Sequence, residues 1–224
     1  MKKFSLAIGT ALALSTSAAM AGSMAAPIVE PPVYTPAPTV AHDWTGGYIG
    51  LSLTYGRSAH SGPAAGSLPN ATGLGGGGLI GYNWQTGDLV FGGEIAGGLA
   101  RMSGSDECDN PAWTCRSRVG TVLSGRVRAG IAMDNTLLFA TGGVASANIR
   151  HSTWHPVFGN FRDTNRTNGM MVGVGLEHAF EGGWNLRGDL EHYRFRRQNF
   201  ALDVPYNGVR ATMNLARVSA VMRF

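Results

Sequence analysis

The C-terminal stretch, residues 210–224, constrains the fold of this chain more than any other. From Ala216 to Phe224 every second residue is apolar or small, and the alternate positions include Arg217, Ser219 and Arg223. A period of two is that of a β-strand with two different faces. Two arginines on one face are costly in lipid, whereas a polar barrel interior accepts them. The stretch therefore predicts a transmembrane β-strand with its apolar face outward.

Seven earlier stretches show comparable alternation. We expect strands near residues 48–55, 73–84, 89–100, 119–132, 136–148, 167–180 and 184–195, with residues 210–224 as the eighth. The connections at 85–88, 133–135 and 181–183 are short, whereas those at 57–72, 101–116, 149–166 and before the last strand are long. Connections that alternate in length are typical of up-and-down outer-membrane barrels. The predicted fold is all-β: an eight-stranded antiparallel up-and-down transmembrane β-barrel with short periplasmic turns and long extracellular loops.

The N-terminal part predicts export. Lys2 and Lys3 precede an apolar run, and Ala19-Met20-Ala21 has the small-x-small pattern of a signal-peptide cleavage site. We expect a signal peptide at 1–21, a proline-rich periplasmic linker at 22–43 and the barrel domain at 44–224. A membrane anchor is the alternative for the first segment. The proline-rich segment is either a spacer or a segment that binds peptidoglycan or a partner.

Charge and glycine content exclude several classes of protein. Lys2 and Lys3 are the only lysines, so removing the signal segment lowers the formal net charge of +4 by two. No basic helix or aromatic-basic motif indicates nucleic-acid binding. Glycine, at 33 residues, is abundant but not periodic, which excludes collagen. Residues 73–78 match G-x-G-x-x-G without the strand, helix and acid of a dinucleotide site, so we expect closely approaching strands there.

Charged residues on the polar phase of the strands are expected inside the barrel. An eight-stranded barrel is only wide enough for side chains to fill it, so opposite charges should pair there. A gated ion path is the alternative. The predicted lumen charge network comprises Glu94, Arg126, Arg128, Glu177, Arg187, Asp189, Glu191 and Arg217.

The two rims are expected to differ. Trp44, Trp84, Phe180 and Trp184 fall beside the chain ends or short turns, which predicts an aromatic girdle at the periplasmic interface. Arginines gather beside the long connections instead. Guanidinium groups suit phosphate oxygens, so we expect the outer rim to contact lipopolysaccharide phosphates, with a solvated rim as the alternative. The predicted contacts are Arg57, Arg118, Arg150, Arg194 and Arg210.

The cysteines and histidines indicate no catalytic or metal site. Cys108 and Cys115 lie close together in an exported chain, which predicts a loop disulfide rather than a zinc site. His151 and His155 share a predicted loop and are interpreted as isolated loop residues. No outward serine accompanies His192 as an esterase would need. We expect no enzyme activity, no cofactor and no metal.

With these residues laid out, residues 44–224 resemble the opacity-type, porin-like outer-membrane proteins, also called the surface-antigen family. The matching pieces are Trp44–Gly50, Gly81–Gln85, Arg126–Gly130, Thr141–Gly143, Gly173–Glu177 and the closing Arg223-Phe224. Met222 stands where the family usually has an aromatic residue, and His178 and His192 where it tends to have tyrosine.

The resemblance implies an integral protein of the Gram-negative outer membrane. The barrel assembly machinery would recognise its last strand, with Phe224 as the assembly signal. Envelope integrity and surface display are the expected functions, among outer-membrane lipids and lipopolysaccharide, and a monomer is expected. A small diffusion channel is the first alternative. A soluble ligand-binding barrel is the second, and it requires the opposite polarity of the two barrel faces.

Overall fold

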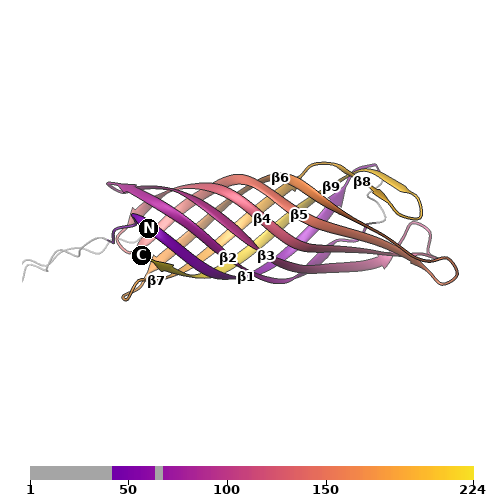
Figure 1. Cartoon of the computed structure of the whole chain (residues 1–224), viewed down its shortest axis with the longest axis horizontal. Helices are drawn as coiled ribbons and strands as arrows, with labels where there is room; N and C mark the ends of the chain where they lie inside the picture. Colours follow the sequence, from indigo (N-terminus) through magenta and orange to yellow (C-terminus); the bar gives the residue numbers. More distant parts are fainter. Residues whose placement is uncertain (1–41, 64–67) are drawn as a thin grey trace, which may run out of the picture. The chain divides into compact units, whose positions relative to one another are not determined.

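A computed structural model describes residues 42–63 and 68–224, and antiparallel strands make up most of this part (Figure 1). The expected signal peptide and almost all of the proline-rich segment lie outside the described residues. Among the described residues no helix is long and apolar enough to cross a membrane. The strands are β1 (Gly46–Ser61), β2 (Ala71–Thr86), β3 (Leu89–Glu107), β4 (Thr114–Met133), β5 (Thr136–His155), β6 (Gly159–Ala179), β7 (Trp184–Phe195), β8 (Gln198–Ala201) and β9 (Pro205–Arg223).

Eight of these strands close into a ring. Each strand from β1 to β7 pairs with the next in an antiparallel sense, β7 pairs with β9, and β9 pairs back with β1. The short strand β8 pairs with β9 outside the ring, as Figure 1 shows. Phe224 exchanges two main-chain hydrogen bonds with Gly47, of 3.1 and 2.9 Å, beside the end of β9. The predicted eight-stranded up-and-down barrel is confirmed.

Two connections that were predicted to be long loops are mostly strand, so the prediction is wrong there. β3 continues to Glu107 and β4 starts at Thr114, so most of 101–116 is strand. β5 and β6 likewise extend until only residues 156–158 separate them. Parts of these polar stretches, such as residues 114–119 and 149–154, still alternate between buried and exposed or half-buried positions, as a strand with two different faces does. The hairpins therefore project as a continuation of the barrel wall.

The wall reverses its polarity along its length. Between the short turns and the level of Tyr55, Leu99 and Leu123, the outward side chains are mostly apolar and the inward ones include many charges; we call this part the belt. Beyond it, in the outer half, the interior is an apolar core that includes Met102 and Phe195, and arginines face outward. The outer half is therefore built like a water-soluble protein.

A bulge in β4 lies where the interior changes from charged to apolar. Gly120 and Thr121 are consecutive exposed residues, and the register with both neighbouring strands shifts there. One extra residue in a period of two moves the following side chains to the other face. Val119 and Val122 both point inward as a result, although they are an odd number of residues apart.

Candidate functional site

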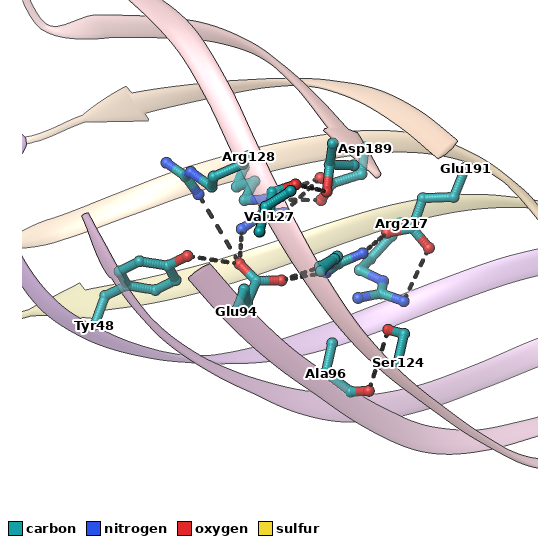
Figure 2. Close-up of polar contacts among 12 residues, drawn as sticks. Tyr48, Glu94, Ala96, Ser124, Val127, Arg128, Asp189, Glu191 and Arg217 are labelled. Carbon is teal, nitrogen blue, oxygen red and sulfur yellow. Dashed lines mark hydrogen bonds and ion pairs between the residues drawn. The ribbon is translucent and has the colours of Figure 1, made fainter. Parts of the chain in front are cut away.

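Glu94, on β3, is the centre of a buried charge network in the belt (Figure 2). It accepts a hydrogen bond from Arg126 Nε at 2.7 Å and one from the Tyr48 hydroxyl at 2.9 Å, and it also pairs with Arg187. Strand register explains the first contact, because Glu94 and Arg126 are directly opposite on β3 and β4. Arg187 comes from β7, across the lumen. The contacts of Glu94 therefore join separate parts of the ring.

A second carboxylate, Glu191, extends the network toward the outer half. It pairs with Arg126 and accepts hydrogen bonds from Arg217 Nη2 at 3.1 Å and from the Tyr193 hydroxyl at 2.7 Å. Figure 2 shows Glu191 and Arg217 facing one another within the barrel. Arg126 thus bridges Glu94 and Glu191, and the two carboxylates share its guanidinium.

The remaining members close the network toward the short turns. Arg187 Nη2 lies 2.8 Å from Asp189 Oδ1, and Arg128 Nη2 lies 3.0 Å from Glu177 Oε2. Glu177 also accepts a hydrogen bond from Asn185 at 2.7 Å. All eight residues expected in the lumen are buried, and they contribute four guanidinium groups and four carboxylates. The charges of this set balance.

Sequence reasoning missed three polar residues that contact the network: Tyr48, Tyr193 and Asn185. Arg223, which the period of two placed on the inward face, also contacts the network, at Glu177. Tyr48 lies on the opposite phase to the outward Ile49 and Leu51, so strict use of the period of two would have placed it inside. The same signal was present for Tyr193, which alternates with the exposed His192 and Arg194. Neither tyrosine was assigned to the lumen.

Trp44 does not belong to the aromatic girdle, so that prediction is wrong. Its side chain is completely buried at the short-turn end of the lumen, in one cluster with Val90, Leu137, Phe139 and Ala179. The guanidinium of Arg223 lies over its ring at 5.2 Å. Trp84, Phe180 and Trp184 have exposed fractions of 57%, 53% and 52%, so their side chains lie on the outer surface near the short turns.

Apolar packing fills the interior of the outer half. Side chains from β2 to β9 form one buried cluster there, including Met102, Ile149, Phe195 and Phe200. The cavity between this cluster and the charge network holds only about 30 Å³, room for one or two water molecules. The lumen is thus closed by three layers: the Trp44 cluster, the charge network and the apolar core.

The arginines expected at the outer rim lie on the outer half of the wall. Arg57, Arg118, Arg150 and Arg194 are exposed, and Arg210 is half-buried. Arg118 and Arg150 are direct cross-strand partners on β4 and β5. The eight ion pairs formed among the described residues involve none of these five. Their charges face the surroundings of the barrel.

The predicted disulfide joins Cys108 and Cys115 at the tip of the β3–β4 hairpin. His151 is not a loop residue, contrary to the prediction. It lies on β5, buried in the outer half, with its Nδ1 3.0 Å from the Ser117 hydroxyl and its ring against Phe200. His155 accepts hydrogen bonds from the main-chain N–H groups of Val157 and Phe158, which closes the β5–β6 turn.

Comparison with known proteins shows matches along most of the chain. Residues 9–224 match the family described as outer membrane protein beta-barrel domain. The 31 kDa outer-membrane immunogenic protein of Brucella melitensis biotype 1 is 26% identical over 242 residues, covering 94% of this chain and 97% of the relative. The 22 kDa outer membrane protein of Rhizobium leguminosarum bv. viciae is 30% identical over 164 residues, covering 73% and 70%.

The chain is also similar to solved structures at low sequence identity. The outer membrane protein OprG of Pseudomonas aeruginosa is 9% identical, with a TM-score of 0.48, and the match covers 80% of this chain and 96% of OprG.

Proposed function

This chain belongs to the outer membrane protein beta-barrel domain family, and on that premise we propose that it is a closed, non-enzymatic barrel that supports envelope integrity and displays its hairpins at the cell surface. Its place is the outer membrane of a Gram-negative bacterium. The proposal rests mainly on one observation: three layers of side chains close the lumen. The belt anchors the barrel, and the outer half carries the hairpins beyond the membrane.

The closed lumen disfavours the alternative of a small diffusion channel. Conduction requires a continuous water path, yet Glu94 and Arg126 fill the middle of the barrel in mutual contact. Separating such a buried pair leaves an unpaired charge, which costs several kcal/mol. The apolar core of the outer half would also have to be disrupted.

The soluble ligand-binding barrel is disfavoured by the belt. Leu51, Val127 and Leu190 have exposed fractions of 76%, 69% and 63%, and each lies on the outer face of its strand. A water-soluble barrel would hide these side chains, because contiguous exposed apolar surface of this kind promotes aggregation. Lipid covers them at no such cost.

The proposed partner of the outer wall is lipopolysaccharide. Arg57, Arg118, Arg150, Arg194 and Arg210 would bind its phosphates through their guanidinium groups. Support comes from the orientation of four of them toward the outer surface and from the lack of ion-pair partners among the described residues. Arg57 also lies at the edge of the belt, two residues beyond Tyr55. Each such contact would tie the barrel to the lipid layer around it.

Planar-bilayer recording tests the closed lumen. The purified protein should give no stable openings under conditions in which a water-filled porin, reconstituted in parallel, conducts. Stable openings of hundreds of picosiemens would show that the lumen conducts and would favour the channel.

Exchange of rim arginines tests the lipid contact. The double variant Arg57→Gln/Arg194→Gln should bring less lipopolysaccharide through purification and should make cells more sensitive to polymyxin. The matched double variant Asp88→Asn/Asp134→Asn alters two exposed charges beside the short turns and should leave both readouts unchanged. Equal behaviour of the two double variants would remove the proposed role of the rim.

A further inference from the structure

Four arginines converge on one cleft of the outer wall. Arg116 and Arg118 project from β4, Arg150 from β5 and Arg162 from β6, and all four are exposed. The strand register makes them neighbours: Arg118 is opposite Arg150, and Ser152 lies between Arg116 and Arg162. The cleft between them measures about 430 Å³. Arg116 and Arg162 were not among the arginines predicted to contact lipopolysaccharide.

No carboxylate of the described residues compensates these charges. The lining of the cleft contains no aspartate or glutamate, and none of the ion pairs formed by the described residues includes any of the four arginines. Like charges directly opposite one another on neighbouring strands destabilise a sheet. The pair Arg118 and Arg150 is such an arrangement, and it suits a surface that receives an anion.

We propose that this cleft binds a saccharide that carries two or more phosphate or sulfate groups. The proposal rests on the proposed outer-membrane function, which places the cleft on the cell surface, and it names a ligand class for that surface. A guanidinium binds two oxygens of a phosphate or sulfate at once, so four of them recognise a ligand with several such groups. Arg150 is already held in position, because its Nε donates to the Thr164 hydroxyl at 2.9 Å.

The other lining residues suit a sugar. Trp154 is 51% exposed and faces the cleft, where its ring offers an apolar surface for the face of a sugar ring. Thr114, Ser152 and Asn160 add hydroxyl and amide groups that can bond to sugar hydroxyls. A bare phosphate would need the arginines alone, whereas a saccharide uses both halves of the cleft.

The height of the cleft favours the saccharide layer over the lipid phosphates. On β4 the last outward apolar residue is Leu123, and Arg118 and Arg116 lie five and seven residues beyond it. At ~3.3 Å per residue and a tilt of ~40°, these arginines stand ~13 and ~18 Å above Leu123. The ligand is then either the phosphorylated core sugar of a lipopolysaccharide or a free anionic glycan.

Binding to the lipopolysaccharide-free protein in detergent micelles tests the proposal. The probes are a fully sulfated heparin tetrasaccharide, its desulfated form, a lipid-free phosphorylated core oligosaccharide and a single-stranded oligonucleotide of equal charge. We expect the wild type to bind one or both anionic saccharides, with affinity that falls as salt rises, and not to bind the desulfated probe. Preference for the core oligosaccharide identifies the membrane lipid as the source; preference for the heparin fragment identifies a free glycan.

Three variants assign the binding to the cleft. Arg116→Gln/Arg162→Gln should weaken binding at least tenfold, and Trp154→Ala about fivefold, with unchanged heat-modifiable migration on gels as the folding control. As the control, Arg196→Gln/Arg197→Gln changes two exposed arginines that do not line the cleft, and this variant should bind the saccharides like the wild type. Three outcomes would each overturn the inference. The cleft variants could bind the saccharides as tightly as the wild type, or the wild type could bind no saccharide. The oligonucleotide could also bind as tightly as the saccharides, with an affinity that Trp154→Ala does not change. The polymyxin experiment would still judge the proposed function separately.

Discussion

At the scale of single residues, position along a strand decides what a charge does. Glu94 and Arg126 are buried and paired, whereas Arg118, on the same strand as Arg126, is exposed. The bulge at Gly120 and Thr121 puts these two arginines on opposite faces although they are an even number of residues apart. One strand therefore supplies both a structural and a surface charge.

Neutralising Glu94 should destabilise the barrel strongly. Glu94→Gln removes the negative charge that Arg126 and Arg187 share, and it leaves positive charge buried without compensation. The expected loss is about 3–5 kcal/mol of unfolding free energy. Urea unfolding in detergent micelles measures it, with Glu181→Gln in the exposed β6–β7 turn as a control within about 0.5 kcal/mol of the wild type. A wild-type midpoint for Glu94→Gln would contradict the network's structural role.

The two classes of tryptophan should respond differently to truncation. Trp44→Ala empties the completely buried site next to Leu137 and Phe139, which should cost about 3–5 kcal/mol. Trp184→Ala removes a half-exposed ring from the outer surface and should cost less. The same unfolding measurement compares them, and a larger effect for Trp184 would argue against Trp44 as the end of the lumen.

At the scale of elements, the glycine-rich stretch of β2 serves the close approach of two strands. A Cβ on Gly77 would lie 2.2 Å from the carbonyl oxygen of Gly97 on β3, far inside contact distance. At the neighbouring Gly76, the nearest atom to a Cβ would be the carbonyl oxygen of Ser52, at 3.5 Å. The match of residues 73–78 to the G-x-G-x-x-G pattern of nucleotide-binding loops is therefore a consequence of close packing between β2 and β3.

These neighbouring glycines give a matched test. Gly77→Ala should lower the unfolding free energy by about 1–3 kcal/mol, because the backbones of β2 and β3 must separate. Gly76→Ala should have little effect. Urea midpoints in micelles measure both variants. Equal loss at the two positions would show that intrinsic β-strand propensity, rather than contact between β2 and β3, determines the change in unfolding free energy.

At the scale of the whole molecule, the barrel joins two structures of opposite polarity. The belt has a charged interior and an apolar outer surface, and the outer half has an apolar core and a polar outer surface. The two halves should therefore respond to different conditions. Acid is one of them, because the core of the outer half contains His60 and His151, whose rings are 4.8 Å apart.

Acidification should loosen the outer half. Burial lowers the pKa of His60 to about 4 and that of His151 to about 3, and the charge of His60 further lowers the latter. Unfolded chains protonate these rings near pH 6.5, so the unfolded state binds more protons below that value. The contribution of these two neutral rings to the free energy of unfolding is therefore fully present above about pH 6.5. It is lost as the pH falls toward 4, the pKa of His60, and then toward 3, the pKa of His151.

Hydrogen exchange at pH 7 and pH 4.5 measures this. Amides of the outer parts of β5 and β9 should lose protection at the lower pH while those of the belt keep it. His60→Asn/His151→Asn should flatten the dependence, because the two buried imidazoles that bind protons in this range are then absent. Loss of protection that persists in this double variant would assign the effect to other groups.

The pattern of the chain predicted the ring and the contents of the belt. Strand number, the sidedness of residues such as Leu51 and Val127, and the inward position of Glu94 all follow from the period of two. It failed at the outer hairpins, where polar residues were interpreted as loops, and at Trp44, where aromatic character was taken as a lipid signal. A residue's neighbours across the barrel decide these positions, and those neighbours come from remote strands.

Periodicity is a local property, so residue order alone establishes which side chains share a face of a strand. It cannot establish which side chains meet: Arg187 reaches Glu94, and the arginines of β4, β5 and β6 gather at one cleft, only after the ring has closed with a particular register. Register and closure depend on all eight strands together. The pairing of charges in the lumen and their concentration on the outer wall are therefore properties of the assembled barrel.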